Sequence, residues 1–151
     1  MNTRNAFTMI ELIFVIVVLG ILAAVAVPKF AATRTDAEIA KARSTVAAVR
    51  SGIVNERQTR LFRGQNNFIS TLDANATVNA SGTTIFDNNG SSDNTIMMYG
   101  VITKKQHGWV KSANNEYTFE LPGQGQAVFT YNPGNGTFDC AASSLCSSLT
   151  N

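Results

Sequence analysis

The sequence predicts an α+β fold, in which a long N-terminal helix packs on a small antiparallel β-sheet head. Three observations predict it: an apolar run at the N-terminus, a proline-free stretch with helical periodicity after it, and short β-type runs separated by Asn, Gly and Ser over the rest of the chain. We therefore divide the chain into a leader (1–6), a transmembrane and assembly helix (7–28), an amphipathic helix (29–63) and a β-rich head (64–151).

Composition already excludes several classes of protein. The chain has 151 residues, of which 44% are hydrophobic and 15% charged, and its net charge is +2. This length suits one domain with an appendage, while the charged fraction lies well below the usual quarter. Low charge with ordinary hydrophobicity is typical of a chain that partly meets lipid or other protein. A disordered tail, a disulfide-dense toxin and a polytopic transporter are excluded.

The apolar run contains one acid. In residues 7–27, 18 of 21 positions are apolar, and the exceptions are Thr8, Glu11 and Gly20. A helix of this length spans about 31 Å, the thickness of a bilayer's hydrocarbon core. Thr8-Met9-Ile10-Glu11 matches the T-x-x-E capping box, which explains why Glu11 is tolerated at a helix start. Capping does not explain why a helix starts inside an apolar run, whereas a cationic partner such as a freed α-amino group would.

A longer pattern surrounds this acid: Ala6-Phe7-Thr8-Met9-Ile10-Glu11-Leu12, the apolar run with Gly20, and Pro28-Lys29-Phe30. It resembles the N-terminus of type IV pilins and type II secretion pseudopilins. The resemblance implies cleavage between Ala6 and Phe7 by a membrane prepilin peptidase, and N-methylation of Phe7. It also implies that Glu11 pairs with the Phe7 amine of a neighbouring subunit. Ala6 and Met9, in place of the commoner Gly and Leu, are mild departures.

The resemblance implies a structural filament subunit, and neither an enzyme motif nor a cofactor or metal site is recognisable in the chain. The implied partners are further copies of the chain, related minor subunits, the prepilin peptidase and an inner-membrane assembly platform with its ATPase. The implied location is the inner membrane, with the head in the periplasm, and then a periplasmic or cell-surface filament. Pilus, secretion pseudopilus and competence filament stay open at this point, as do major and minor subunit.

Two alternatives remain. Ala24-Val25-Ala26 has the small-x-small form of a secretory cleavage site, so cleavage after Ala26 would release a soluble binding domain; the acidic Glu11 argues against it. Alternatively, the filament binds DNA, because residues 29–63 carry eight Lys or Arg against three acids. Such a pattern is more typical of a solvated or subunit-facing surface, and the acidic head offers it a partner. A DNA site would use Arg57, Arg60 and Arg63.

The predicted helix has two weak points and one apolar stripe. Gly20 weakens it, and Pro28 should kink it or remove a hydrogen bond. The stripe recurs at spacings of 7, 3, 4, 3 and 4 and fades at Glu56 and Arg60. Its members are Ala32, Ile39, Ala42, Val46, Val49 and Ile53.

In the head, we expect six strands with one buried face against this stripe. The predicted ranges are 68–72, 83–86, 95–102, 108–111, 116–121 and 127–131, and the last three read as a meander. Cys140 and Cys146 are expected to form a disulfide, because an exported head lies where disulfides form.

Weaker patterns in the head lead to hypotheses. Asn75 and Asn89 lie in D-x-N-x-S/T sequences that fit an extended N-glycosylation acceptor. Residues 87–93 lack the full calcium-loop register and are read as a polar turn. The lone His107 is read as a turn residue rather than a ligand or base.

Overall fold

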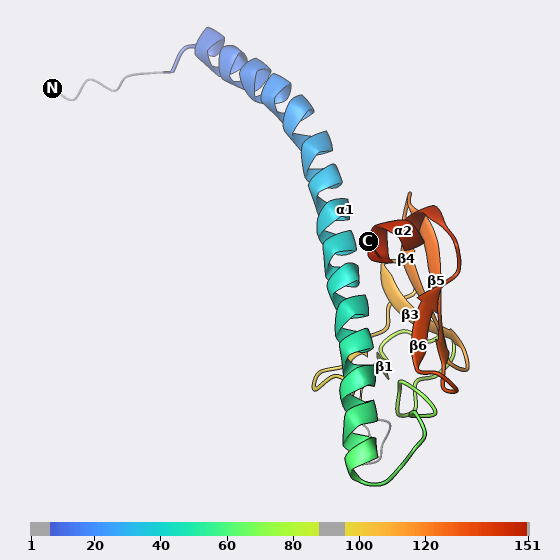
Figure 1. Cartoon of the computed structure of the whole chain (residues 1–151). Helices are drawn as coiled ribbons and strands as arrows, with labels where there is room; N and C mark the ends of the chain where they lie inside the picture. Colours follow the sequence, from blue (N-terminus) through green and yellow to red (C-terminus); the bar gives the residue numbers. More distant parts are fainter. Residues whose placement is uncertain (1–6, 88–95, 151) are drawn as a thin grey trace, which may run out of the picture. The chain divides into compact units, whose positions relative to one another are not determined.

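The computed structural model describes residues 7–87 and 96–150, with only the backbone of Ala31 and Ala32. It confirms the α+β fold (Figure 1). The elements in chain order are helix α1 (Met9–Phe62), strands β1 (Thr84–Ile85), β2 (Val101–Ile102), β3 (Gly108–Ala113), β4 (Glu116–Leu121), β5 (Gly125–Asn132) and β6 (Thr137–Cys140), and helix α2 (Ser144–Thr150). The chain forms two compact units, which divide inside α1 between Ala37 and Glu38.

Helix α1 runs for 54 residues and passes through Pro28 without a break, as the sequence predicts. Because Pro28 has no N–H, the carbonyl of Ala24 lacks its usual helical donor. The helix ends in a Schellman motif at Gly64, whose φ of 76° suits a residue without Cβ. Gly64 N–H donates to the carbonyl of Leu61 (3.0 Å), and Gln65 N–H donates to that of Arg60 (2.9 Å).

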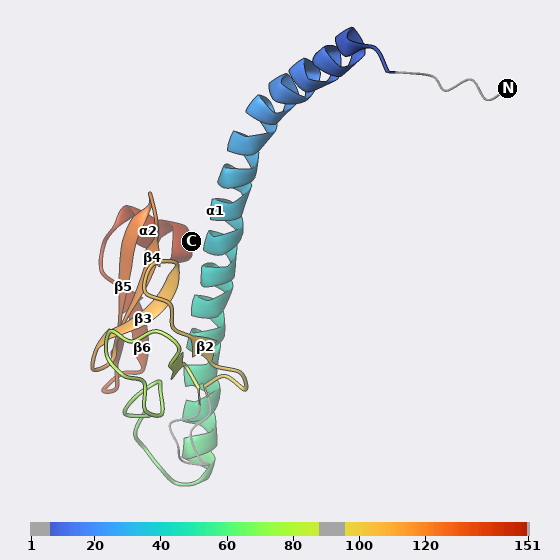
Figure 2. The same cartoon turned by 180° about the vertical axis from the view of Figure 1, so that it is seen from behind.

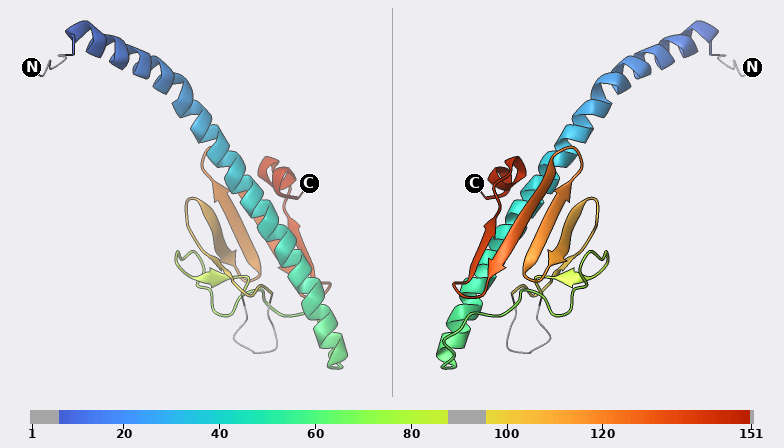
Figure 3. Two further views of the ribbon diagram at one scale, coloured as in Figure 1. Left: turned by 90° about the vertical axis from the view of Figure 1, so that its left-hand side faces the viewer. Right: turned by 90° about the vertical axis from the view of Figure 1, so that its right-hand side faces the viewer.

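The core lies between the second half of α1 and one face of an antiparallel sheet with strand order β3-β4-β5-β6 (Figure 3). The predicted stripe is confirmed at Ala42, Val46, Val49 and Ile53, each at most 2% exposed. The sheet packs against this stripe with side chains at alternate strand positions, because side chains along a strand alternate between the two faces of a sheet. These are mainly Trp109, Tyr117, Phe119, Phe129, Tyr131 and Phe138.

The apolar stripe ends at Ile53, but the buried face of α1 continues through Glu56 and Arg60. Glu56 is 6% exposed, and its Oε1 lies 3.6 Å from Nε of Arg60, whose side chain is 12% exposed. Beyond the apolar stripe, the buried face thus carries an ion pair. Helical periodicity in hydrophobic residues alone could not reveal it, because the charged members of the face count as surface.

The strand predictions succeed for the meander and in part at 83–86, which contains β1, and they fail at 68–72. Residues 116–121 are predicted with the observed bounds, and β3 and β5 extend beyond the predicted ranges. Residues 68–72 are not a strand, and within 96–102, the described part of the predicted 95–102, only Val101–Ile102 is one, paired with β1. Strand β6 and helix α2 were not predicted. Ile69 and Leu72 lie in an irregular loop, and each side chain is buried separately in the core. Such a loop has the same apolar sequence pattern as a short strand.

Candidate assembly site

Thr8 caps the start of α1 and holds Glu11 beside it. The Glu11 N–H donates to the Thr8 carbonyl (3.1 Å) and to Thr8 Oγ1 (3.4 Å), and the Thr8 hydroxyl donates to Glu11 Oε2 (3.4 Å). Glu11 is exposed and lies in the first turn, where the helix dipole favours a negative charge. Local capping therefore accounts for the position of the carboxylate within the chain and leaves it accessible to a cation.

The first part of α1 exposes apolar side chains on all sides. Phe7, Met9 and Ile10 are more than three-quarters exposed, and the large apolar side chains that follow, up to Phe30, are exposed as well. Among the described residues, α1 is the one helix long and apolar enough to cross a membrane: its most apolar 18-residue window has a mean hydropathy of 3.0 and none of it is buried. A cleavable signal sequence passes the same test, so length and composition alone do not separate the two alternatives.

Gly20 and Pro28 lie within this apolar part of α1. A Cβ at Gly20 would meet no atom within 4 Å, so nothing within the described chain requires glycine there. Glycine inside a helix is nevertheless unfavourable by about 1 kcal/mol relative to alanine. An advantage of Gly20, if it has one, therefore lies in contacts outside the chain or in the looseness that it gives the helix.

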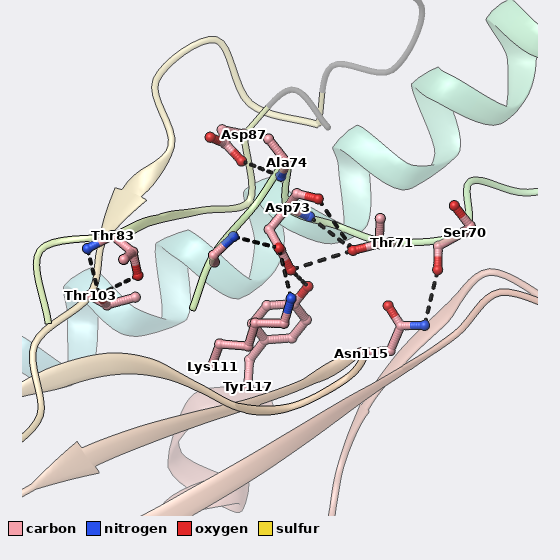
Figure 4. A network of polar contacts seen from close by, with 11 residues as sticks. Ser70, Thr71, Asp73, Ala74, Thr83, Asp87, Thr103, Lys111, Asn115 and Tyr117 are labelled. Atoms are coloured by element: carbon pink, nitrogen blue, oxygen red, sulfur yellow. Dashed lines mark hydrogen bonds and ion pairs between the residues drawn. The ribbon is translucent and has the colours of Figure 1, made fainter. Parts of the chain in front are cut away.

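A buried carboxylate organises the head (Figure 4). Asp73, 2% exposed, lies in the loop between α1 and β1, and four donors reach its carboxylate: the Lys111 ammonium at 2.8 Å, the Tyr117 hydroxyl at 2.6 Å, the Ala76 N–H at 3.0 Å and the Thr71 hydroxyl at 3.4 Å. A carboxylate with these partners is satisfied, and removal of one member would leave the others unpaired. The cluster joins the loop to β3 and β4 and is structural.

Burial sets the protonation of two tyrosines in this core. It raises the pKa of Tyr117 well above its usual value, and the hydrogen bond and negative charge of Asp73 raise it further. Burial raises the pKa of Tyr131 to about 12, against a lowering by Arg60. The Tyr131 hydroxyl donates to the carbonyl of Ile69 at 2.9 Å. Both phenols therefore stay protonated at physiological pH and act as hydrogen-bond donors.

Two arginines of α1 hold the C-terminal part of the chain. Arg50 donates through Nε (3.1 Å) and Nη2 (3.0 Å) to the carbonyl of Phe138 in β6, and Arg43 donates through Nε (3.0 Å) and Nη2 (2.6 Å) to the carbonyl of Ser148 in α2. The Arg50 guanidinium thus takes a carbonyl that an edge strand would otherwise offer to another chain. The expected disulfide between Cys140 and Cys146 is present and joins β6 to α2.

Two of the three arginines named for a DNA site make contacts within the head. Arg57 donates to Asn66 Oδ1 (3.2 Å) and lies over the ring of Phe68, 4.6 Å from its centroid. Arg60 pairs with Glu56 and donates to Gln65 Oε1 (3.2 Å). With Arg43 and Arg50, four of the eight Lys and Arg residues of 29–63 therefore make contacts within the head.

The weaker hypotheses meet different outcomes. Asn75 is exposed, but the acid of its D-x-N-x-T sequence is Asp73, which is buried and bonded, so an enzyme that reads this acid would have to act before the head folds. Asn89 lies outside the described residues, as does most of 87–93 and the cleavage-site residue Ala6. Among the residues that the structure describes, no three His, Cys, Asp or Glu side chains gather to hold a metal. His107 is exposed.

Residues 1–27, which include the apolar start of α1 and the acid in its first turn, match the family model of the prokaryotic N-terminal methylation motif. A stretch of 47 residues, 31% of the chain, is 51% identical to the type IV narrow pilus major component PilA5 of Thermus thermophilus. The match spans about two fifths of the length of that relative (40%). No solved structure matches the chain.

Sequence reasoning missed the residues that build the head. The sequence places Asp73 in a D-x-N-x-T pattern and Arg43 and Arg50 in a basic stretch, and neither pattern indicates their contacts in the head. One signal could have singled out Glu56: it lies at the next position of the apolar stripe, three residues after Ile53. The pairing of Asp73 with Lys111 joins positions far apart in the chain, and a single sequence carries no signal for it.

Proposed function

We propose that the chain is the structural subunit of a type IV pilus-like or pseudopilus filament, matured by a prepilin peptidase between Ala6 and Phe7 and assembled through α1. One observation carries the proposal: the first part of α1 is apolar on all sides and exposed, with Glu11 alone charged in its first turns. A helix that is apolar all round belongs in lipid or among other helices. The subunit would therefore wait in the inner membrane and then join a filament core.

Glu11 would set the register between subunits. Cleavage before Phe7 frees an α-amino group four residues from the carboxylate, and N-methylation keeps that group cationic. In a water-poor bundle, an unpaired carboxylate and an unpaired ammonium are each costly, whereas the two together satisfy one another. A subunit displaced along the axis would leave both unpaired, so the pair favours one register over others.

A second face of α1 supports helix packing between subunits. In the unit that begins at Glu38, exposed positions of α1 recur at spacings of four and three residues and carry no charge: Ala40, Ser44, Ala47, Ser51, Val54, Gln58 and Leu61. Spacing of this kind forms a continuous seam along a helix, and small residues allow the backbones of two helices to approach closely. This outer face of α1 is opposite in phase to the stripe that packs on the sheet.

The first experiment measures the mass of the mature N-terminus. Protein isolated from its native host should begin at methylated Phe7, whereas a chain that begins at Val27 would overturn the filament proposal and favour the soluble domain. Filaments sheared from cells should contain the chain, and the inner membrane should hold its unassembled form with the head accessible from the periplasm.

The second experiment separates registration from capping. Glu11→Gln removes the charge and keeps the side-chain shape, while Thr8→Ala removes the cap and keeps the acid. We expect Glu11→Gln to be processed and to accumulate in the membrane but to yield no filaments, and Thr8→Ala to assemble. Equal loss of filaments in both variants would show that Glu11 acts only as a helix cap.

A further inference from the structure

An apolar tip projects from the head at Met98 and Tyr99, which are 84% and 82% exposed. The residues on either side of this pair point the other way: Ile96 is buried, and Met97 and Val101 pack against the core. In Figures 1 and 2 the yellow segment that carries the tip crosses α1 and projects on the side away from the four-stranded sheet. The segment that carries the tip lies against α1 at Gly52, the residue that follows Ser51 of the outer face.

The backbone on both sides of the tip is held by close contacts at glycines. A Cβ at Gly52 would lie 2.3 Å from the carbonyl oxygen of Ile96, so only glycine lets α1 and this segment approach so closely. A Cβ at Gly100 would lie 2.7 Å from the carbonyl oxygen of Ile85. The β1–β2 ladder, with Ile85 opposite Val101, closes the loop. The exposure of the tip is thus built into the packing of its flanks.

The composition of the tip limits the kinds of partner that it can bind. Residues 96–103 carry no Lys, Arg, Asp or Glu, so the tip has no charge with which to hold a nucleic acid or an ionic ligand. A buried tyrosine covers about 150–250 Å², and a stable pairwise interface needs about 800 Å² on each partner. Two side chains are too few for a free-standing complex. They suit a contact with a partner that a larger interface already holds.

We propose that Met98 and Tyr99 pack against a second copy of this chain, next to the contact that the outer face of α1 makes in the filament. The inference rests on the proposed filament function. It adds a head-level contact between copies, in which the tip of one subunit meets a different surface of the next; such a heterologous contact repeats along a helical assembly instead of closing on itself. Aromatic and Met side chains are enriched in contacts of this kind.

Photo-crosslinking in intact filaments tests the contact. A benzophenone amino acid replaces Tyr99 in the full chain, and a control carries it at Thr130, which is exposed on the outer face of β5. We expect a crosslinked species of twice the subunit mass from position 99, at several times the yield from position 130. Equal yields, no crosslink from position 99, or a crosslink to a different protein would each overturn the inference.

A double variant gives a second readout. Met98→Ser with Tyr99→Ser should leave the thermal unfolding midpoint of the head unchanged, because both side chains are exposed, while filament yield falls roughly tenfold as for loss of an interface hot spot. Unchanged yield would overturn the inference and leave the filament proposal intact. If the wild-type chain forms no filaments at all, the proposed function fails, and the inference falls with it.

Discussion

The hydroxyl of Tyr117 donates a 2.6 Å hydrogen bond to the carboxylate of Asp73, and burial of both groups makes this contact a fixed part of the head. Lys111 neutralises the same carboxylate at 2.8 Å. Together they bind an irregular loop to two strands, so the loop needs no strand ladder of its own. The head therefore presents a firm surface, although much of the chain between α1 and β3 lacks regular structure.

Asp73→Ala should destabilise the head by about 3–5 kcal/mol, because it leaves the Lys111 ammonium buried without its counterion and the Tyr117 hydroxyl without its acceptor. The control is Asp139→Ala, which removes an exposed carboxylate 3.9 Å from Arg50, a surface pair worth about 0–1 kcal/mol. Urea unfolding of the full chain in detergent, followed by Trp109 fluorescence, measures both. Similar small losses in the two variants would contradict the structural role of Asp73.

Tyr131 should make the head lose stability at high pH. Its pKa is raised to about 12 in the folded head, against about 10 when unfolded. Between these values the unfolded chain releases a proton that the folded chain keeps, so its contribution is fully present below pH 10 and declines by about 1.4 kcal/mol per pH unit up to pH 12. Urea titrations from pH 8 to pH 12 measure the slope. Tyr131→Phe should show a shallower decline, and an identical slope would refute the assignment.

The sequence predicted those elements whose signal is local. The apolar run, the four-residue cap and the regular stripe from Ala42 to Ile53 each repeat a simple pattern, and the structure reproduces them. The sequence of strand β4 alternates between polar and apolar residues and is bounded by turn residues, so the sequence predicts both of its ends. The strand predicted at 68–72 failed because side chains of an irregular loop can be buried singly, with Tyr131 rather than a strand taking the carbonyl of Ile69.

The missed elements depend on contacts between distant parts of the chain. Strand β6 is short and forms against β5, while Arg50 of α1 takes its carbonyl at Phe138. Helix α2 is a serine-rich segment of seven residues whose Leu145 and Leu149 reach the core. Neither has enough local propensity to be recognised, since packing and a disulfide stabilise them. For the proposed assembly site, the sequence predicts Glu11 and its cap, and the structure shows both.

Reduction of the disulfide should loosen α2 while the sheet persists. Cys140 and Cys146 close a loop of six residues' separation, and a bridge over so short a loop contributes about 2 kcal/mol in the chain-entropy model. We expect a reductant to lower the unfolding midpoint of the full chain and to increase proteolysis within 141–150. Cys140→Ser with Cys146→Ser should behave like the reduced protein and be insensitive to reductant. A midpoint that does not change on reduction would show that Arg43 and the two leucines suffice to hold α2.

Two glycines of α1 should differ in how their substitution by alanine affects the stability of the head. At Gly52 the new methyl group would lie 2.3 Å from the carbonyl oxygen of Ile96, so the tip segment must shift, at a cost of about 1–3 kcal/mol for overpacking. At Gly20 nothing lies within 4 Å, and the head is not involved. In chemical unfolding, the free energy of unfolding of the head should therefore fall in Gly52→Ala and stay unchanged in Gly20→Ala.

The same pair distinguishes head packing from helix packing in assembly. If Gly20 serves contacts or looseness in the filament core, Gly20→Ala should reduce filament yield without altering the stability of the head. Gly52→Ala should lower both, because the displaced segment carries Met98 and Tyr99. Normal filaments from Gly20→Ala would remove Gly20 from the assembly site. Normal filaments from a destabilised Gly52→Ala would mean that the tip tolerates displacement, and that its contact with the second copy contributes little to assembly.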